Sequence, residues 1–165
     1  MTKKKILFVC LGNIVRSPLA ENIFRHMITQ EGLHDKYESA SAGIEPWHVG
    51  EPPDPRMVRV AAQHGLNYSG KAKQVNRLDL SSYDMILAMD HNNLSSLLRL
   101  ADGQPAVQNI HLLRDYDSQS EDGLAIPDPY YGGLDGFETV FDIVKRSCRG
   151  LLDALERKDR QEQRG

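Results

Sequence analysis

The sequence is poor in cysteine, in long apolar runs and in excess charge of either sign. Its 165 residues include only two cysteines, Cys10 and Cys148, too few for the disulfide framework of a small secreted protein. No apolar run approaches the ~20 residues of a membrane span, and the N-terminus lacks the features of a signal peptide. The net charge of -3 offers no bulk attraction for nucleic acid. We therefore expect a cytoplasmic protein with reduced thiols and no membrane or nucleic-acid partner.

Strand and helix patterns alternate along the chain, which indicates a parallel sheet with helices on both faces. We expect an α/β fold, a three-layer α/β/α arrangement with a four-stranded parallel sheet, in a single domain over residues 1–165 whose charged tail frays from Lys158. The expected strands cover 5–9, 38–41, 83–89 and 107–112; the expected helices run from Ser17 to Gly32, from Asp54 to Gly65, from Asp90 onward and over 135–157, with a long loop over 114–133.

The connection between the first strand and the first helix has the pattern of a phosphate-binding loop. Cys10 and Arg16 are separated by five residues, and Ser17 and Pro18 then open the helix. Backbone amides can converge on a phosphate if this segment curls, and Gly12 and Asn13 tolerate the left-handed backbone that a curl needs. The helix N-terminus and the arginine fork would bind the same anion. The expected phosphate-binding residues are Leu11, Gly12, Asn13, Ile14, Val15, Arg16 and Ser17.

Cys10 is the candidate nucleophile of this loop. A helix N-terminus, backbone amides and a guanidinium all favour the thiolate form of a cysteine. The thiolate would attack phosphorus, and the Ser17 hydroxyl would then help the sulfur to leave. Taken alone, a single cysteine is more often a small buried apolar residue. The apolar strand before Cys10, the glycine and asparagine inside the loop, and the Ser-Pro start of the helix favour the catalytic interpretation.

Asp128 is the candidate proton donor for the departing oxygen. It lies in the long loop between two prolines, Pro127 and Pro129, which stiffen its position. A proline-flanked turn residue is the alternative, and composition alone favours that alternative.

The run from Val9 to Pro18 closely resembles the signature of the low-molecular-weight protein tyrosine phosphatases. The segment 128–131 resembles the acid loop of that family, and the resemblance extends over nearly the whole chain in the right order. It implies a metal-free, cofactor-free enzyme that hydrolyses phosphotyrosine in proteins and releases inorganic phosphate. It also implies a phosphocysteine on Cys10, phosphate binding by Arg16, and Asp128 as acid and then base. We expect a monomer, with a weak dimer as the alternative.

The resemblance assigns roles to residues outside the loop as well. Asn13 would hold the strained backbone of the loop through Ser41. Trp47, Tyr130 and Tyr131 would be walls of a substrate cleft, which suits a flat phosphophenol. Ordinary packing is the other explanation for these three aromatic residues.

Two positions depart from the family pattern. Val15 stands where the family commonly has a second cysteine, so we expect peroxide to oxidise Cys10 beyond recovery by thiols, with Cys148 as a core residue on the last helix. No histidine occurs near Gly70, where many members have one that supports the loop serine. His64 lies at a helix end, so the loop would depend on another group or a water.

Three other functions remain open from the sequence. Thioredoxin-coupled arsenate reduction would use the same cradle, but it needs two further cysteines and the chain offers only Cys148. The loop also resembles that of protein-arginine phosphatases, although such enzymes tend to have threonine where this chain has Ile14. The branched side chain of Ile14 would crowd a guanidinium phosphate and favour an aromatic one, so we expect Ile14 to line the substrate cleft. A binding module without turnover is the third, and the presence of Cys10, Arg16 and Asp128 argues against it.

Overall fold

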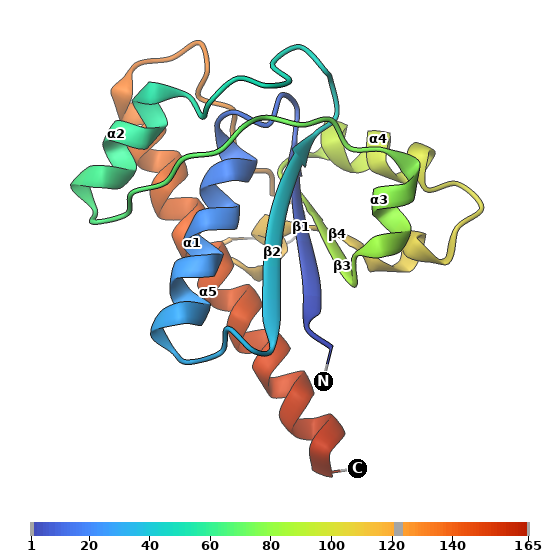
Figure 1. Cartoon of the computed structure of the whole chain (residues 1–165). Coiled ribbons are helices and arrows are strands. Elements are labelled where there is room, and N and C mark those ends of the chain that lie inside the picture. The colour runs from blue at the N-terminus through green and yellow to red at the C-terminus, as the bar shows by residue number, and fades with distance from the viewer. Residues whose placement is uncertain (1, 121–123, 165) are drawn as a thin grey trace.

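The fold is built on one parallel sheet with helices on both faces (Figure 1). The computed structural model describes residues 2–120 and 124–164. The strands are β1 (Lys4–Cys10), β2 (Tyr37–Gly43), β3 (Met85–Ala88) and β4 (Ile110–Leu112), in the order β2-β1-β3-β4. All three pairings are parallel. The predicted α/β class and four-stranded sheet are confirmed.

The two faces of β1 bury alternate side chains, because successive residues of a strand point in opposite directions. Ile6 and Phe8 pack into the apolar cluster under α1 (Arg16–Gln30), α2 (Pro55–Gln63) and α5 (Leu134–Arg164). Leu7 and Val9 belong to the cluster under α3 (Arg77–Ser82) and α4 (His91–Leu100). Helices therefore cover both sheet faces, and β1 lies at the centre of the molecule.

The helix ends follow the local signals in the sequence. Asp54 and Asp90 cap α2 and α4 with side-chain oxygens that accept backbone N–H bonds. Gly32 adopts a φ of 67° just after α1, which a glycine tolerates without strain. The helix α1 begins at Arg16, one residue before the predicted start, so Pro18 lies inside its first turn.

Several elements differ from the sequence expectations, three of them clearly. Residues 107–109 are not strand but part of a 3-10 helix, Pro105–Asn109, and β4 begins only at Ile110. The short helix α3 was not predicted; Asn76 and Asp79 form a reciprocal capping box that starts it. The helix α5 continues to Arg164, past the expected fraying point at Lys158.

The end of α5 is held by polar contacts with the residue before β2 and with the first residue of β2. Lys36 contacts Glu156 at 2.7 Å and Asp159 at 2.5 Å, and the Tyr37 hydroxyl donates to Glu156. These contacts explain why the charged tail stays helical beyond its last buried residue, Leu155.

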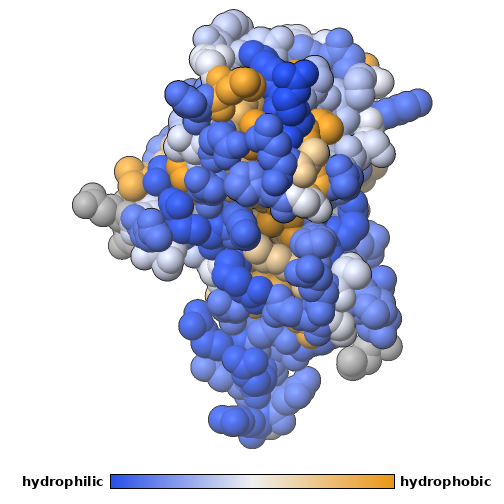
Figure 2. Space-filling view, turned by 90° about the vertical axis from the view of Figure 1, so that its left-hand side faces the viewer, coloured by the Kyte–Doolittle hydropathy of each residue, from blue (hydrophilic) through white to orange (hydrophobic). Residues whose placement is uncertain are grey.

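The side of the molecule that carries α1, α2 and α5 is mostly hydrophilic (Figure 2). Apolar atoms show in patches near its upper end and in a hollow at its middle. Within the described ranges, no helix combines the length and the apolar character needed to cross a membrane.

Candidate active site

The loop between β1 and α1 lies at the carboxyl end of the sheet, where open α/β folds bind ligands. Cys10 is the last residue of β1, and its Sγ lies 3.0 Å from Ser17 Oγ in the first turn of α1. Both side chains are buried. Ser17 is thus placed to donate a hydrogen bond to the sulfur, as the sequence predicts.

Asn13 has the strained backbone that a curled loop requires. Its φ is 59°, in the left-handed region that asparagine tolerates better than most residues. Gly12 needs no positive φ; its role is different from the predicted one. A Cβ on Gly12 would lie 2.8 Å from the ring of His48, so glycine lets that ring approach the loop closely.

The side chain of Asn13 joins the loop to its surroundings through both of its polar atoms. Its Oδ1 accepts from the backbone N–H of Lys73 at 2.9 Å. Its Nδ2 donates to Ser17 Oγ at 2.8 Å and to Ser41 Oγ at 3.0 Å. The predicted support through Ser41 is therefore present in the geometry.

Glu21 completes this network at its outer end. Ser41 Oγ donates to Glu21 Oε1 at 2.6 Å, and Arg25 pairs with the same carboxylate. A carboxylate only accepts hydrogen bonds, so it fixes the Ser41 proton outward and leaves the Ser41 oxygen free to accept from Asn13. A carboxylate on α1 is thus the other group that supports the loop in this chain, which has no histidine near Gly70.

His64 has no part in this network. It caps α2, its Nε2 contacts Glu138 at 3.0 Å, and its ring stacks on Phe141 with centroids 4.2 Å apart. It therefore has the helix-end role that its place in the sequence indicates.

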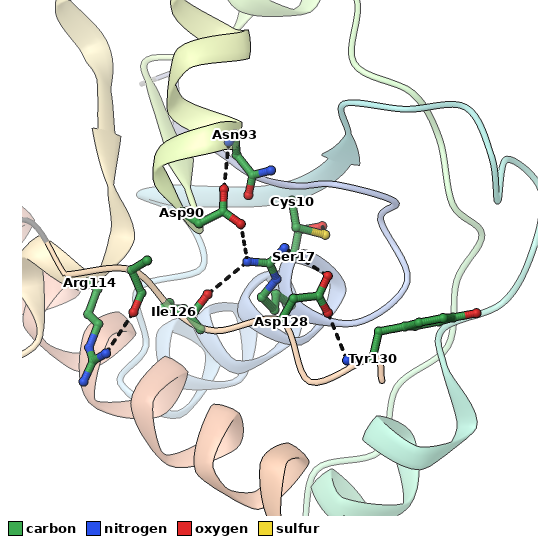
Figure 3. A network of polar contacts seen from close by, with 10 residues as sticks. Cys10, Ser17, Asp90, Asn93, Arg114, Ile126, Asp128 and Tyr130 are labelled. Carbon is green, nitrogen blue, oxygen red and sulfur yellow. Dashed lines mark hydrogen bonds and ion pairs between the residues drawn. The ribbon is translucent and has the colours of Figure 1, made fainter. Parts of the chain in front are cut away.

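Arg16 is buried, and three of its hydrogen-bond partners, Asp90, Ile126 and Asp128, surround it from the start of α4 and the loop before α5 (Figure 3). One guanidinium nitrogen donates to Asp90 at 2.8 Å and to the carbonyl of Ile126 at 2.9 Å. The other lies 3.4 Å from Asp128. Asp90, where the sequence predicts the start of a helix, accepts from the backbone N–H of Asn93 as the cap of α4 and also orients Arg16.

We call residues 125–131 the acid loop. Its Ile126 N–H donates to the carbonyl of Met89 at 2.8 Å, which fixes the loop to the end of β3. Asp128 accepts from the backbone N–H of Tyr130 at 3.1 Å and remains partly exposed. The loop therefore presents this carboxyl toward Arg16 and Cys10 (Figure 3).

The cleft above the loop has aromatic walls. Tyr130 and Tyr131 meet edge to face with centroids 5.0 Å apart, and Tyr131 is 97% exposed. The ring of His48 lies 6.2 Å from that of Tyr130. His48 was missed in the sequence because a single histidine next to Trp47 carries no pattern. The cleft is lined by Cys10, Leu11, Gly12, Ile14, Val15, Arg16, Trp47, His48, Asp128, Tyr130 and Tyr131.

Cys148 lies apart from the cleft residues. It is fully buried on α5, with its Sγ 3.7 Å from the carbonyl of Ala20. Burial raises the pKa of the Cys148 thiol, which keeps it protonated and unreactive. Both cysteines are free.

The described part of the chain shows no group of three or more histidine, cysteine, aspartate or glutamate side chains suited to a metal ion. The cleft offers the thiol of Cys10, the guanidinium of Arg16 and the carboxyl of Asp128. A thiol at the end of a strand, inside a loop that faces a helix N-terminus and a buried arginine, defines a cysteine-dependent phosphatase site.

Comparison with known proteins agrees with that class. The family model for low molecular weight phosphotyrosine protein phosphatases matches residues 5–162. A relative from Sus scrofa with that name is 42% identical over 156 residues, covering 92% of this chain and 96% of its own. The chain belongs to the low molecular weight phosphotyrosine protein phosphatase family, and the resemblance seen in the sequence is confirmed.

Solved structures show the same fold. A protein tyrosine phosphatase from Entamoeba histolytica superposes with a TM-score of 0.90 at 36% identity, covering 95% of this chain and 99% of that one. A Drosophila arginine phosphatase superposes with a TM-score of 0.84 at 35% identity, covering 92% of this chain and 97% of that one.

Proposed function

We propose that this protein hydrolyses phosphotyrosine in proteins through a phosphocysteine intermediate on Cys10. The observation that carries the proposal is the placement of the Cys10 thiol, Arg16 and Asp128 around one cleft with aromatic walls. Relatives named as phosphotyrosine protein phosphatases support the choice of substrate. The free Cys10 thiol suits a reducing compartment, so we also propose a cytoplasmic location.

In the first step the Cys10 thiolate attacks phosphorus and the bond from phosphorus to the phenolic oxygen breaks. Asp128 gives its proton to that oxygen, so tyrosine leaves neutral. Arg16 turns from Asp128 to hold two phosphate oxygens with its planar fork. Its contact with Asp128 is long for a hydrogen bond, at 3.4 Å, so this exchange gives up a weak interaction.

In the second step water attacks the phosphorus of the phosphocysteine. Asp128, now a carboxylate, takes the proton from water, and the bond from phosphorus to sulfur breaks. The products are inorganic phosphate and the thiolate, which Ser17 stabilises through the hydrogen bond that its position allows. Atoms and charge balance without a metal or a redox partner.

The proposal is tested by turnover on a phosphotyrosine peptide, a phosphoarginine peptide and arsenate side by side. We expect activity on phosphotyrosine, and loss of at least about a thousandfold in Cys10→Ser, as for removal of other nucleophiles. With p-nitrophenyl phosphate, whose acidic leaving group needs little help from an acid, Asp128→Asn should accumulate a phosphoprotein that mass spectrometry locates on Cys10. Faster turnover of phosphoarginine would identify an arginine phosphatase instead, and hydrolysis by Cys10→Ser would contradict the mechanism.

A further inference from the structure

The acid loop is held by a repeated arrangement of paired side chains. In each case an arginine that pairs with an aspartate also donates a hydrogen bond to a backbone carbonyl of the acid loop. The pairs are Arg114–Asp117, Arg16–Asp90 and Arg56–Asp54, and their carbonyl acceptors are Ala125 at 2.8 Å, Ile126 at 2.9 Å and Tyr130 at 2.9 Å.

Arg56 makes the contact nearest to the catalytic carboxyl. Its acceptor, Tyr130, also donates its own N–H to Asp128. The guanidinium lies over the Tyr130 ring, 5.1 Å from the centroid, and over the Phe137 ring at 4.7 Å. It therefore fixes both the backbone and the ring of Tyr130, since cation–π stacking and the hydrogen bond act on the same residue.

Asp54 sets the plane of that guanidinium. Its two carboxylate oxygens accept from Arg56 Nε at 3.1 Å and from the terminal nitrogen at 2.7 Å. Burial alone would raise the pKa of Asp54, but the hydrogen bonds from Arg56 outweigh it and lower the pKa. Asp54 also donates its backbone N–H to the carbonyl of Ile14 at 2.8 Å. A continuous path of contacts thus runs from the phosphate-binding loop to the acid loop.

Arg56 can keep its contacts throughout the reaction. Arg16 must reorient to bind phosphate, so its hold on Asp128 changes with each turnover. Arg56 does not line the cleft, and its contacts with Asp54 and Tyr130 need not change when phosphate enters. Its side chain is 39% exposed, while that of Asp54 is 6% exposed.

We propose that Arg56, held by Asp54, is a positioning residue that keeps Asp128 over the phosphate-binding loop through its contacts with Tyr130. This role rests on the proposed phosphatase activity, because it concerns the delivery of a proton to the departing phenol. The need for a proton depends on the leaving group: a weakly acidic phenol needs it, and an acidic one needs it much less.

The test compares kcat/KM for phenyl phosphate and p-nitrophenyl phosphate in Arg56→Ala and Arg56→Lys. We expect Arg56→Ala to lower the value for phenyl phosphate about tenfold and that for p-nitrophenyl phosphate less than about twofold, because a small displacement of a catalytic group costs rate without removing it. Arg56→Lys should give an intermediate loss, since lysine keeps the charge but has no planar fork.

Two controls separate positioning from stability. Arg149 is 41% exposed and bridges Glu31 and Asp153 far from the acid loop; Arg149→Ala should lower Tm but leave the ratio of the two kcat/KM values unchanged. In the Asp128→Asn background, Arg56→Ala should add little further loss, because residues that act as a unit are not additive.

Equal losses on both substrates in Arg56→Ala, or a full additional loss in the Asp128→Asn background, would overturn the positioning role. Should Arg56→Ala fail to fold, Arg56→Lys decides by the same ratio. An inactive wild-type enzyme on both aryl phosphates would instead refute the proposed function, so the two failures are distinguishable.

Discussion

At the scale of single residues, Glu21 shows how a group remote from sulfur can set its hydrogen bonding. The carboxylate orders the protons of Ser41, Asn13 and Ser17, so that the Ser17 hydroxyl proton is free for Cys10. The resemblance predicts the inner residues of this path, because Asn13 and Ser17 lie in the signature and the family pattern places Ser41 beside them. It does not predict Glu21, because a glutamate on a helix is usually a solvated side chain.

We expect Glu21→Ala to lower kcat by about fivefold, the effect of losing ~1 kcal/mol of support for the departing sulfur. The loss should fall on the second step, so the burst of phenol before steady turnover should become larger. Glu31→Ala, which removes another carboxylate near the end of α1, is the control and should leave kcat unchanged. A rise in kcat would show that Glu21 acts mainly by repelling the thiolate.

Val15 lies beside Arg16 in the cleft, where it gives Cys10 no thiol partner. Peroxide should carry Cys10 to the sulfinic acid, so dithiothreitol should restore less than about a fifth of the activity. Val15→Cys should recover more after the same treatment, because a sulfenic acid condenses with a nearby thiol to a reducible disulfide. Activity and the mass of the Cys10 peptide measure both outcomes. Full recovery in the unchanged enzyme would contradict this prediction.

At the scale of elements, the sequence predicts the strands and helices with long apolar patterns and misses those decided by local geometry. β1 is a continuous apolar run and α5 has one apolar face, and the structure confirms both elements. The 3-10 turn at Pro105–Asn109 begins with a proline, but its apolar residues continue into β4 and read as one strand. Packing between elements, rather than pattern, sets such boundaries.

Gly150 in α5 illustrates a constraint that helix propensity hides. A Cβ at this position would lie 1.8 Å from the carbonyl oxygen of Tyr116. Alanine normally stabilises a helix interior by ~1 kcal/mol relative to glycine. Here we expect Gly150→Ala to destabilise the protein by about 1–3 kcal/mol, because the 3-10 helix Leu113–Tyr116 must move away.

Gly136 provides the matched control in the same helix. A Cβ there would meet Pro129 at 3.4 Å, an ordinary contact. Urea unfolding should therefore show a midpoint for Gly136→Ala equal to or above that of the wild type, and a lower one for Gly150→Ala. Equal midpoints in the two variants would mean that the interface between α5 and the 3-10 helix adjusts freely.

At the scale of the whole molecule, the layers and the site position follow from the sequence because both depend on the same alternation. Parallel strands bring their carboxyl ends to one edge, so Cys10 at the end of β1 and Asp90 beyond the end of β3 both lie there. The acid loop comes from residues far along the chain, and its place over the cleft is set by arginine contacts to backbone carbonyls. Backbone acceptors leave no mark in a sequence, so this arrangement could not be predicted.

Carboxyl–cation clusters join distant parts of the fold and should make its stability depend on pH. Burial would raise the pKa of Asp117, but its bonds to Arg146 and Arg114 outweigh burial and lower it. The pKa of Glu156 is lowered in the same way by Lys36 and Tyr37, against the effect of burial. Folding thus lowers both values relative to the unfolded chain, where they lie near 4.

The unfolded chain therefore binds more protons in acid than the folded one does, and stability is lost as the pH falls below about 4.5 through the folded pKa values. Urea midpoints measured from pH 7 to pH 3 should stay level above pH 5.5 as far as these groups are concerned and fall steadily below pH 4.5. Asp117→Asn should lower the free energy of unfolding at pH 7 by roughly 2–3 kcal/mol, and the urea midpoint with it, because it leaves Arg146 and Arg114 without their carboxylate. The same variant should lose less on acidification than the wild type, whereas Asp102→Asn, at an exposed residue after α4, should follow the wild-type curve. An acid dependence as steep in Asp117→Asn as in the wild type would show that this cluster does not couple folding to protonation.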